Sequence, residues 1–266
     1  MSRIAGVFEN LRQNGRSALI TFVEAYDPDR ATSMALLTGM AENGADIIEI
    51  GMPFTDPMAD GPVVQAAGRR GLSAGATLLT TLDLVREFRQ LNDHIPLVLM
   101  GYLNPILSYG IEAFCQDAAR CGIDGVIIVD LPPEEAELVL PHASANGLDV
   151  IRLVAPTTSD TRLRQVLTGS SGFVYYVSIT GVTGTRTATA ADLARDIPRI
   201  RAATNLPVAV GFGVRTPEQA AIVAAHADAA VVASALIETL CKEGAEAVLR
   251  DVKAFSDAMG RTSKAA

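Results

Sequence analysis

Lysine and histidine are scarce in this chain, and their positions restrict the chemistry that it can perform. Its only lysines are Lys242, Lys253 and Lys264. None follows a predicted strand, where a Schiff-base nucleophile would be expected, so a Schiff-base aldolase is excluded. Its only histidines are His94, His142 and His226. They precede strands or lie on a helix, without a carboxylate cluster, so we expect no metal site and no metal-dependent lyase or epimerase.

Other absences exclude further classes of protein. No G-x-G-x-x-G motif follows a predicted strand, which argues against a dinucleotide site. The three cysteines, Cys115, Cys121 and Cys241, lack metal-type spacing and are expected to be reduced. No apolar run approaches the roughly 18 residues of a membrane span, and the first 16 residues lack the apolar core of a signal peptide. With a net charge of −8, we expect a cytoplasmic protein without a nucleic-acid surface.

Apolar segments rich in valine and isoleucine recur between helical patterns. Eight strands are predicted, at Ala18–Val23, Ala45–Ile50, Pro96–Gly101, Gly125–Asp130, Val150–Val154, Phe173–Ser178, Pro207–Gly211 and Ala229–Ala233. Strands that alternate with helices indicate a parallel sheet. Eight units in about 250 residues favour an α/β fold with a single (β/α)8 TIM barrel over residues 1–266. An extra amphipathic helix precedes the first strand, and long loops follow the second and sixth strands.

A short repeat marks the turns that lead into the strands. Glycine and aspartate recur as Gly44-Ala45-Asp46, Gly122-Ile123-Asp124, Gly147-Leu148-Asp149 and, without the glycine, His226-Ala227-Asp228. Glycine there suits the end of a helix. These aspartates would lie at the N-terminal rim of the barrel, where residues serve stability rather than chemistry.

Two carboxylates distinguish the region of the second strand. Glu49 lies inside an apolar strand, and Asp60 lies in the loop that follows, which Pro53, Pro57 and Pro62 stiffen. A buried charge is costly unless it has a partner or a function. Two carboxylates in unlike surroundings can divide the acid and base roles of a reaction. Carboxylate acid–base catalysis without a metal or a covalent intermediate is therefore predicted.

Two loops at the same mouth suit a phosphate group. Gly211-Phe212-Gly213 follows the seventh strand, and Ala233-Ser234-Ala235 follows the eighth strand just before a helix. Backbone N–H groups at a helix N-terminus bind anions, and barrels often bind phosphate at these loops. Apolar residues near other strand ends could line a pocket beside them, which indicates an aromatic phosphate ester as the substrate.

Several motifs closely resemble those of the tryptophan synthase alpha subunit. They are Glu49 to Pro62 (EIGMPFTDPMADGP), Gly101 to Pro105 (GYLNP), Val129 to Glu135 (VDLPPEE), Ser178 to Gly184 (SITGVTG) and Gly211 to Val214 (GFGV). The likeness runs from the N-terminal helix to the last helix, and the first motif is highly specific.

The resemblance implies reversible retro-aldol cleavage of indole-3-glycerol phosphate to indole and glyceraldehyde 3-phosphate. Glu49 would be the principal acid–base group, and Asp60 would accept a hydrogen bond from the indole N–H. The residues implied to hold the indole and its reacting chain are Phe22, Tyr102, Ile127, Tyr175, Thr183 and Phe212. Those implied for the phosphate are Gly184, Gly213, Ala233 and Ser234.

The resemblance also implies a partner. The family works as an α2β2 complex in which a beta subunit carries pyridoxal phosphate and receives indole through an internal channel. No cofactor is expected in the present chain. The loop that contains Phe54, Asp56 and Pro57 would face the beta subunit. Two other functions stay open: a stand-alone lyase that releases free indole, and a catalytically silent barrel that serves only as a partner.

Three positions depart from the family pattern. Glu24 and Tyr26 replace the threonine and glycine that are usual after the first strand, and Ala233 replaces a glycine before Ser234. We expect Tyr26 to alter the shape of its loop, and the Cβ of Ala233 to crowd the phosphate or strain the backbone. We also hypothesise that Glu24, facing the mouth, raises the pKa of Glu49 by like-charge repulsion.

Overall fold

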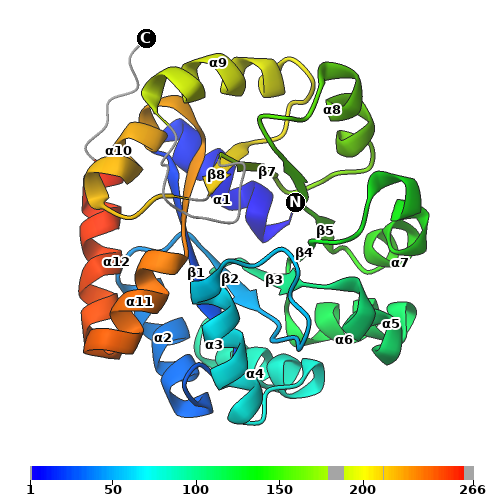
Figure 1. Cartoon of the computed structure of the whole chain (residues 1–266), viewed down its shortest axis with the longest axis vertical. Coiled ribbons are helices and arrows are strands. Elements are labelled where there is room, and N and C mark those ends of the chain that lie inside the picture. Colours follow the sequence, from blue (N-terminus) through cyan, green and yellow to red (C-terminus); the bar gives the residue numbers. More distant parts are fainter. Residues whose placement is uncertain (1, 179–188, 212, 261–266) are drawn as a thin grey trace.

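The computed structural model describes residues 2–178, 189–211 and 213–260, and the strands of this part form a nearly closed ring. The strands are β1 (Ala18–Glu24), β2 (Ile47–Gly51), β3 (Leu97–Gly101), β4 (Gly125–Ile128), β5 (Asp149–Val150), β6 (Arg152–Val154), β7 (Val174–Val177), β8 (Val208–Gly211) and β9 (Ala229–Val232). They pair in parallel in the order β5-β4-β3-β2-β1-β9-β8-β7-β6. The two end strands, β5 and β6, are consecutive in the chain, so the barrel is nearly closed, and the predicted TIM barrel is confirmed (Figure 1).

The fifth predicted strand is divided, which corrects its predicted bounds. Asp149 and Val150 pair with β4, whereas Arg152 to Val154 pair with β7. Ile151 lies between the two pieces. Apart from Arg152 the segment from Val150 to Val154 is apolar, so hydropathy alone could not show that its two halves bond to different neighbours.

Helices surround the strands in Figure 1. Those of the described residues are α1 (Arg3–Gln13), α2 (Arg30–Glu42), α3 (Pro62–Ser73), α4 (Leu78–Leu91), α5 (Leu103–Tyr109), α6 (Ile111–Cys121), the 3-10 helix η1 (Pro133–Leu138), α7 (Leu140–Ala145), α8 (Asp160–Leu167), α9 (Ala190–Arg201), α10 (Pro217–His226), α11 (Ser234–Glu243) and α12 (Ala245–Gly260). None of these helices has the length and apolar character needed to cross a membrane.

The N-terminal helix α1 packs against one end of the barrel interior, across the middle of the ring in Figure 1. Its buried residues Ile4, Phe8 and Leu11 belong to the same apolar cluster as Ile20, Ile47 and Val98 of the strands. The ring of Phe8 lies 5.9 Å from that of Phe173, measured between centroids. The apolar interior therefore continues from α1 into the middle of the barrel.

The aspartates of the repeated turns have the structural role that the sequence indicates. Each of three accepts a hydrogen bond from the backbone N–H of a neighbouring strand, so a donor at the sheet end does not go unpaired. The pairs are Asp46 with Leu19, Asp124 with Leu97 and Asp228 with Val208, at 2.8–2.9 Å. Asp149 differs, because it accepts from the Ser2 hydroxyl that caps α1.

Candidate active site

Glu49 points into the barrel because it lies two residues after Ile47, an interior residue, and therefore on the same face of β2. Its neighbours in the sheet are Phe22 of β1 and Val98 of β3. The residue is 1% exposed, and neither carboxylate oxygen has a hydrogen-bond partner among the described residues. Burial raises the pKa of Glu49 from 4.5 to about 8, because the charged form loses its hydration. At neutral pH the group can therefore hold a proton and release it, as a general acid–base catalyst must.

Asp60 is held above β2 by contacts of its own loop. The backbone N–H of Ala59 donates to the Tyr102 hydroxyl at 3.1 Å, and Gln65 Nε2 donates to the Asp60 carbonyl at 2.9 Å. Burial raises the pKa of the half-buried Asp60 carboxyl group, while a hydrogen bond from Tyr102 partly opposes this. Glu49 and Asp60 thus differ in environment, as the sequence predicts: one is sealed in the barrel and the other lies at its rim.

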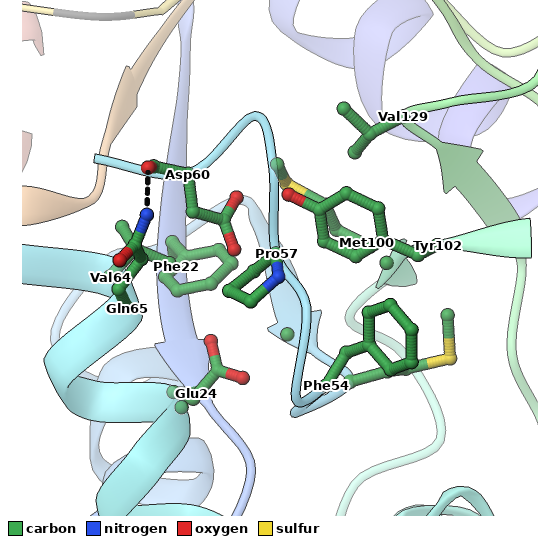
Figure 2. Close-up of a pocket in the computed structure, with 14 residues that line it drawn as sticks. Phe22, Glu24, Phe54, Pro57, Asp60, Val64, Gln65, Met100, Tyr102 and Val129 are labelled. Atoms are coloured by element: carbon green, nitrogen blue, oxygen red, sulfur yellow. Dashed lines mark hydrogen bonds between the residues drawn. The ribbon is translucent and has the colours of Figure 1, made fainter. Parts of the chain in front are cut away.

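A pocket opens beside Asp60, and Figure 2 shows the residues that line it. Its apolar wall includes Phe22, Met100 and Val129, which come from or directly follow β1, β3 and β4. Its polar carboxyl groups come from Asp60 and Glu24. A flat aromatic ring would bury its faces against such a wall and present its N–H to a carboxylate. Sequence reasoning did not identify the part of the wall that α3 contributes: Val64, Gln65 and Gly68.

Tyr175 and Ile127 lie deeper, in the barrel interior. Both are buried and belong to the apolar cluster around the strands. Burial raises the pKa of Tyr175 well above its ordinary value, and the negative charge of nearby Glu49 adds to this. The phenol extends over Gly211 of β8, where a Cβ would stand 2.3 Å from its oxygen. Gly211 therefore leaves the room that Tyr175 needs in order to approach Glu49.

The phosphate loops are partly described. Ser234 is the first residue of α11, whose N-terminus has no side-chain cap, so its first N–H groups are available to an anion. Gly213 has a φ of 90°, which a glycine adopts without strain. Thr183, Gly184 and Phe212 lie outside the described residues.

Ala233 does not strain the backbone, contrary to one of our expectations. Its φ of −120° lies outside the left-handed region where glycine is favoured. This position therefore does not need the left-handed conformation that favours glycine over alanine.

The loop of Phe54, Asp56 and Pro57 covers one side of the pocket. The ring of Phe54 lies 5.5 Å from that of Tyr102, measured between centroids, and Pro57 also lines the pocket. Asp56 is exposed and accepts a hydrogen bond from the Thr55 hydroxyl. Met58 is 76% exposed. One side of the loop thus forms the site, and the other side is open to a partner.

Glu24 faces the mouth as predicted, but its electrostatic neighbours differ from those expected. Burial is the one cause that raises the pKa of Glu49, so the repulsion from Glu24 that we hypothesised is absent there. Glu24 instead interacts with Asp60 and Asp27, which add to the effect of burial in raising its own pKa. The reason is the open space at Gly51, into which the Glu24 carboxyl group extends.

At Tyr26 the loop after β1 adopts the backbone conformation that favours glycine, although the residue is a tyrosine. Tyr26 has a φ of 63°, in the left-handed region, and its side chain is buried. The next residue, Asp27, is 1% exposed and forms two hydrogen bonds with Arg70 of α3, at 2.6 and 2.8 Å. This ion pair joins the loop to α3. No sequence signal indicated it, because Arg70 occurs in an ordinary helical pattern.

The fold and site together define a (β/α)8-barrel enzyme with a pair of unlike carboxyl groups at the C-terminal ends of its strands. No cluster of His, Cys, Asp or Glu among the described residues could hold a metal ion. The sequence profile of the family described as Tryptophan synthase alpha chain matches residues 8–264. The chain belongs to this family, and the resemblance given by its motifs is confirmed.

Individual members of this family match the chain over nearly its full length. The tryptophan synthase alpha chain of Acidiphilium cryptum is 66% identical, with 100% of each chain covered. That of Granulibacter bethesdensis is 61% identical and covers 100% of this chain and 96% of the relative. The crystal structure of tryptophan synthase subunit alpha from Legionella pneumophila superposes with a TM-score of 0.92 at 37% identity, over 98% of this chain and 100% of the other.

Proposed function

We propose that the chain cleaves indole-3-glycerol phosphate to indole and glyceraldehyde 3-phosphate, with Glu49 and Asp60 as its catalytic residues. The observation that carries the assignment is the isolation of Glu49. Its carboxyl group is buried, has no partner among the described residues, and has a pKa raised to about 8. A structural carboxylate would be paired, whereas a general acid needs a proton that it can give away.

The reaction needs one proton to be added to a carbon and a second proton to be removed from a hydroxyl group. Glu49 in its protonated form gives its proton to C3 of the indole ring, which produces a cationic indolenine. Asp60, ionised at the rim, accepts a hydrogen bond from the ring N–H and stabilises this cation. Glu49, now ionised, takes the proton of the adjacent glycerol hydroxyl. The bond between C3 and the hydroxyl-bearing carbon breaks, and its electrons restore the indole ring as the aldehyde forms.

The remaining predicted residues would position the substrate. Phe22, Tyr102, Ile127, Tyr175 and Phe212 hold the indole ring and its reacting chain. Gly184, Gly213, Ala233 and Ser234 hold the phosphate, with support from the uncapped N-terminus of α11. Thr183, which lies outside the described residues, is proposed as a further substrate-binding residue from the family motif alone.

The family pairs with a beta subunit, and its alpha chain needs no cofactor of its own. We propose that the exposed side of the Phe54 to Met58 loop, including Asp56 and Pro57, contacts that subunit. The beta subunit would hold pyridoxal phosphate and join indole to serine in an α2β2 complex. The same loop lines the pocket from within, so contact on its outer side can change the position of Asp60.

The direct test is indole release from indole-3-glycerol phosphate by the purified chain, alone and with a tryptophan synthase beta subunit. Slow release alone, a large rise with the partner, and a loss of about 10²–10⁴-fold in Glu49→Gln and Asp60→Asn are expected. Glu42→Gln, an exposed residue at the end of α2, is the matched control and should keep wild-type activity. Fast release without a partner would favour a stand-alone lyase. No release in either condition would favour a silent barrel.

A further inference from the structure

Glu24 is a buried carboxyl group in the pocket that the reaction described above does not use. It is the last residue of β1 and is 6% exposed. Burial and two nearby carboxylates act on its side chain, and none of the described residues is a hydrogen-bond partner of its carboxyl group. Figure 2 shows Glu24 and Asp60 reaching the same pocket from different elements. Because its carboxyl group lines the pocket, it can reach a ligand bound there.

Two glycines leave space for this carboxyl group. A Cβ on Gly51 would lie 2.2 Å from Glu24 Oε2, and a Cβ on Gly68 of α3 would lie 3.7 Å from Oε1. The same Cβ on Gly51 would lie 2.7 Å from Cζ of Phe22. The carboxyl group is therefore fixed beside the edge of the Phe22 ring, at the wall against which an indole ring would lie.

The charges around Glu24 favour its neutral form. Burial raises its pKa well above the ordinary value, and the negative charges of Asp60 and Asp27 raise it further. Arg70, the cation of this region, forms its hydrogen bonds with Asp27. A neutral carboxyl group has one O–H donor and one free carbonyl oxygen, so it can both donate to and accept from a hydroxyl or amino group.

We propose that Glu24 determines substrate specificity, by forming a hydrogen bond with a hydroxyl or amino group on the six-membered ring of the indole. The proposal rests on the function given above, in which Asp60 takes the ring N–H. The edge of the six-membered ring then faces the second carboxyl group of the pocket, which belongs to Glu24. A site built around a buried polar group discriminates against ligands that leave it unpaired, so polar ring substituents are accepted better than apolar ones of equal size.

The test uses the reverse reaction, in which C3 of an indole adds to the aldehyde carbon of glyceraldehyde 3-phosphate. We would measure kcat/KM for indole and for the hydroxyindoles and methylindoles substituted at positions 4, 5, 6 and 7. For at least one position the hydroxyindole should exceed the methylindole by about tenfold, as one hydrogen bond of ordinary strength provides. In Glu24→Leu the ratio should fall to near one, and Glu24→Gln should retain part of it.

Equal hydroxyl-to-methyl ratios in wild type and Glu24→Leu at all four positions would overturn the proposal. Comparing ratios within each variant separates specificity from any general loss of activity. Thermal melting checks that Glu24→Leu is folded. If Glu24→Leu is not folded, Glu24→Thr, which also lacks the carboxyl group, is measured in its place. Failure to convert unsubstituted indole would refute the catalytic function instead. Calorimetric binding of the same indoles would then still decide the role of Glu24.

Discussion

Replacing Glu49 by glutamine is expected to stabilise the fold at neutral and alkaline pH while removing catalysis. The pKa of Glu49 rises from 4.5 to about 8 on burial, so the folded chain binds this proton more tightly than the unfolded chain does. Its contribution to stability is fully present below pH 4.5 and is lost as the pH rises to about 8. Glutamine has nearly the same shape and cannot ionise, so the variant does not undergo this loss.

The size of the effect follows from the same two values. Each pH unit between them corresponds to about 1.4 kcal/mol. The ionisable group therefore costs the fold roughly 3 kcal/mol at pH 7 and about 5 kcal/mol above pH 8. These figures are upper bounds, because the interior relaxes around a charge. Near pH 4.5 both side chains are neutral and equally buried, so the two proteins should have nearly the same free energy of unfolding.

Urea unfolding followed by circular dichroism at pH 5, 7 and 9 measures this difference. The advantage of Glu49→Gln over wild type should grow from pH 5 to pH 9 and then stop growing. Glu42→Gln, which changes an exposed carboxylate, should show no such growth. An advantage of Glu49→Gln that stays constant with pH, or an equal one in Glu42→Gln, would refute the reasoning that burial alone sets this pKa.

Three further outcomes are expected. The kcat/KM for cleavage should fall as the pH rises through about 8, where Glu49 loses the proton that it must donate; a rate unchanged up to pH 10 would contradict its role as the acid. Gly51→Ala should lower kcat/KM with a normal fold by circular dichroism, since its Cβ would displace Glu24 and Phe22, and unchanged kinetics would rule out that crowding. Tyr26→Gly should lower the free energy of unfolding, because losing a buried aromatic ring costs about 3–5 kcal/mol and relief of the left-handed backbone returns about 1–3 kcal/mol. A more stable Tyr26→Gly would show that strain outweighs packing.

Much of the fold could be predicted from the sequence because its signals are local. Apolar runs mark buried parallel strands, and a charged residue inside one of them, Glu49, must point inward at a site. The place of Asp60 near the mouth could be predicted because prolines restrict its loop and the motif is highly specific. The aspartates of the turns could be assigned from their repeated position before strands.

The electrostatic neighbours of Glu24 and Asp27 could not be predicted in this way. Alternation along β1 showed that Glu24 faces the mouth, but not toward which side its carboxyl group extends. That direction depends on the missing Cβ of Gly51, a residue of the next strand. The pairing of Asp27 with Arg70 likewise depends on how α3 packs against the first loop. Both are contacts between different helices and strands, and the pattern of residues along one element does not predict them.

The division of the fifth predicted strand at Ile151 separates the barrel into two sets of strands. Residues up to Val150 supply the continuous series β1 to β5, and residues from Arg152 onward supply β6 to β9. The two series are hydrogen-bonded to each other along β1 and β9, while on the opposite side the chain itself passes from one series to the other. The carboxyl groups that we propose as catalytic and the pocket belong to the first series, and the described residues that we propose to bind phosphate belong to the second. A substrate bound as proposed would therefore bridge the two half-barrels and contact both series of strands.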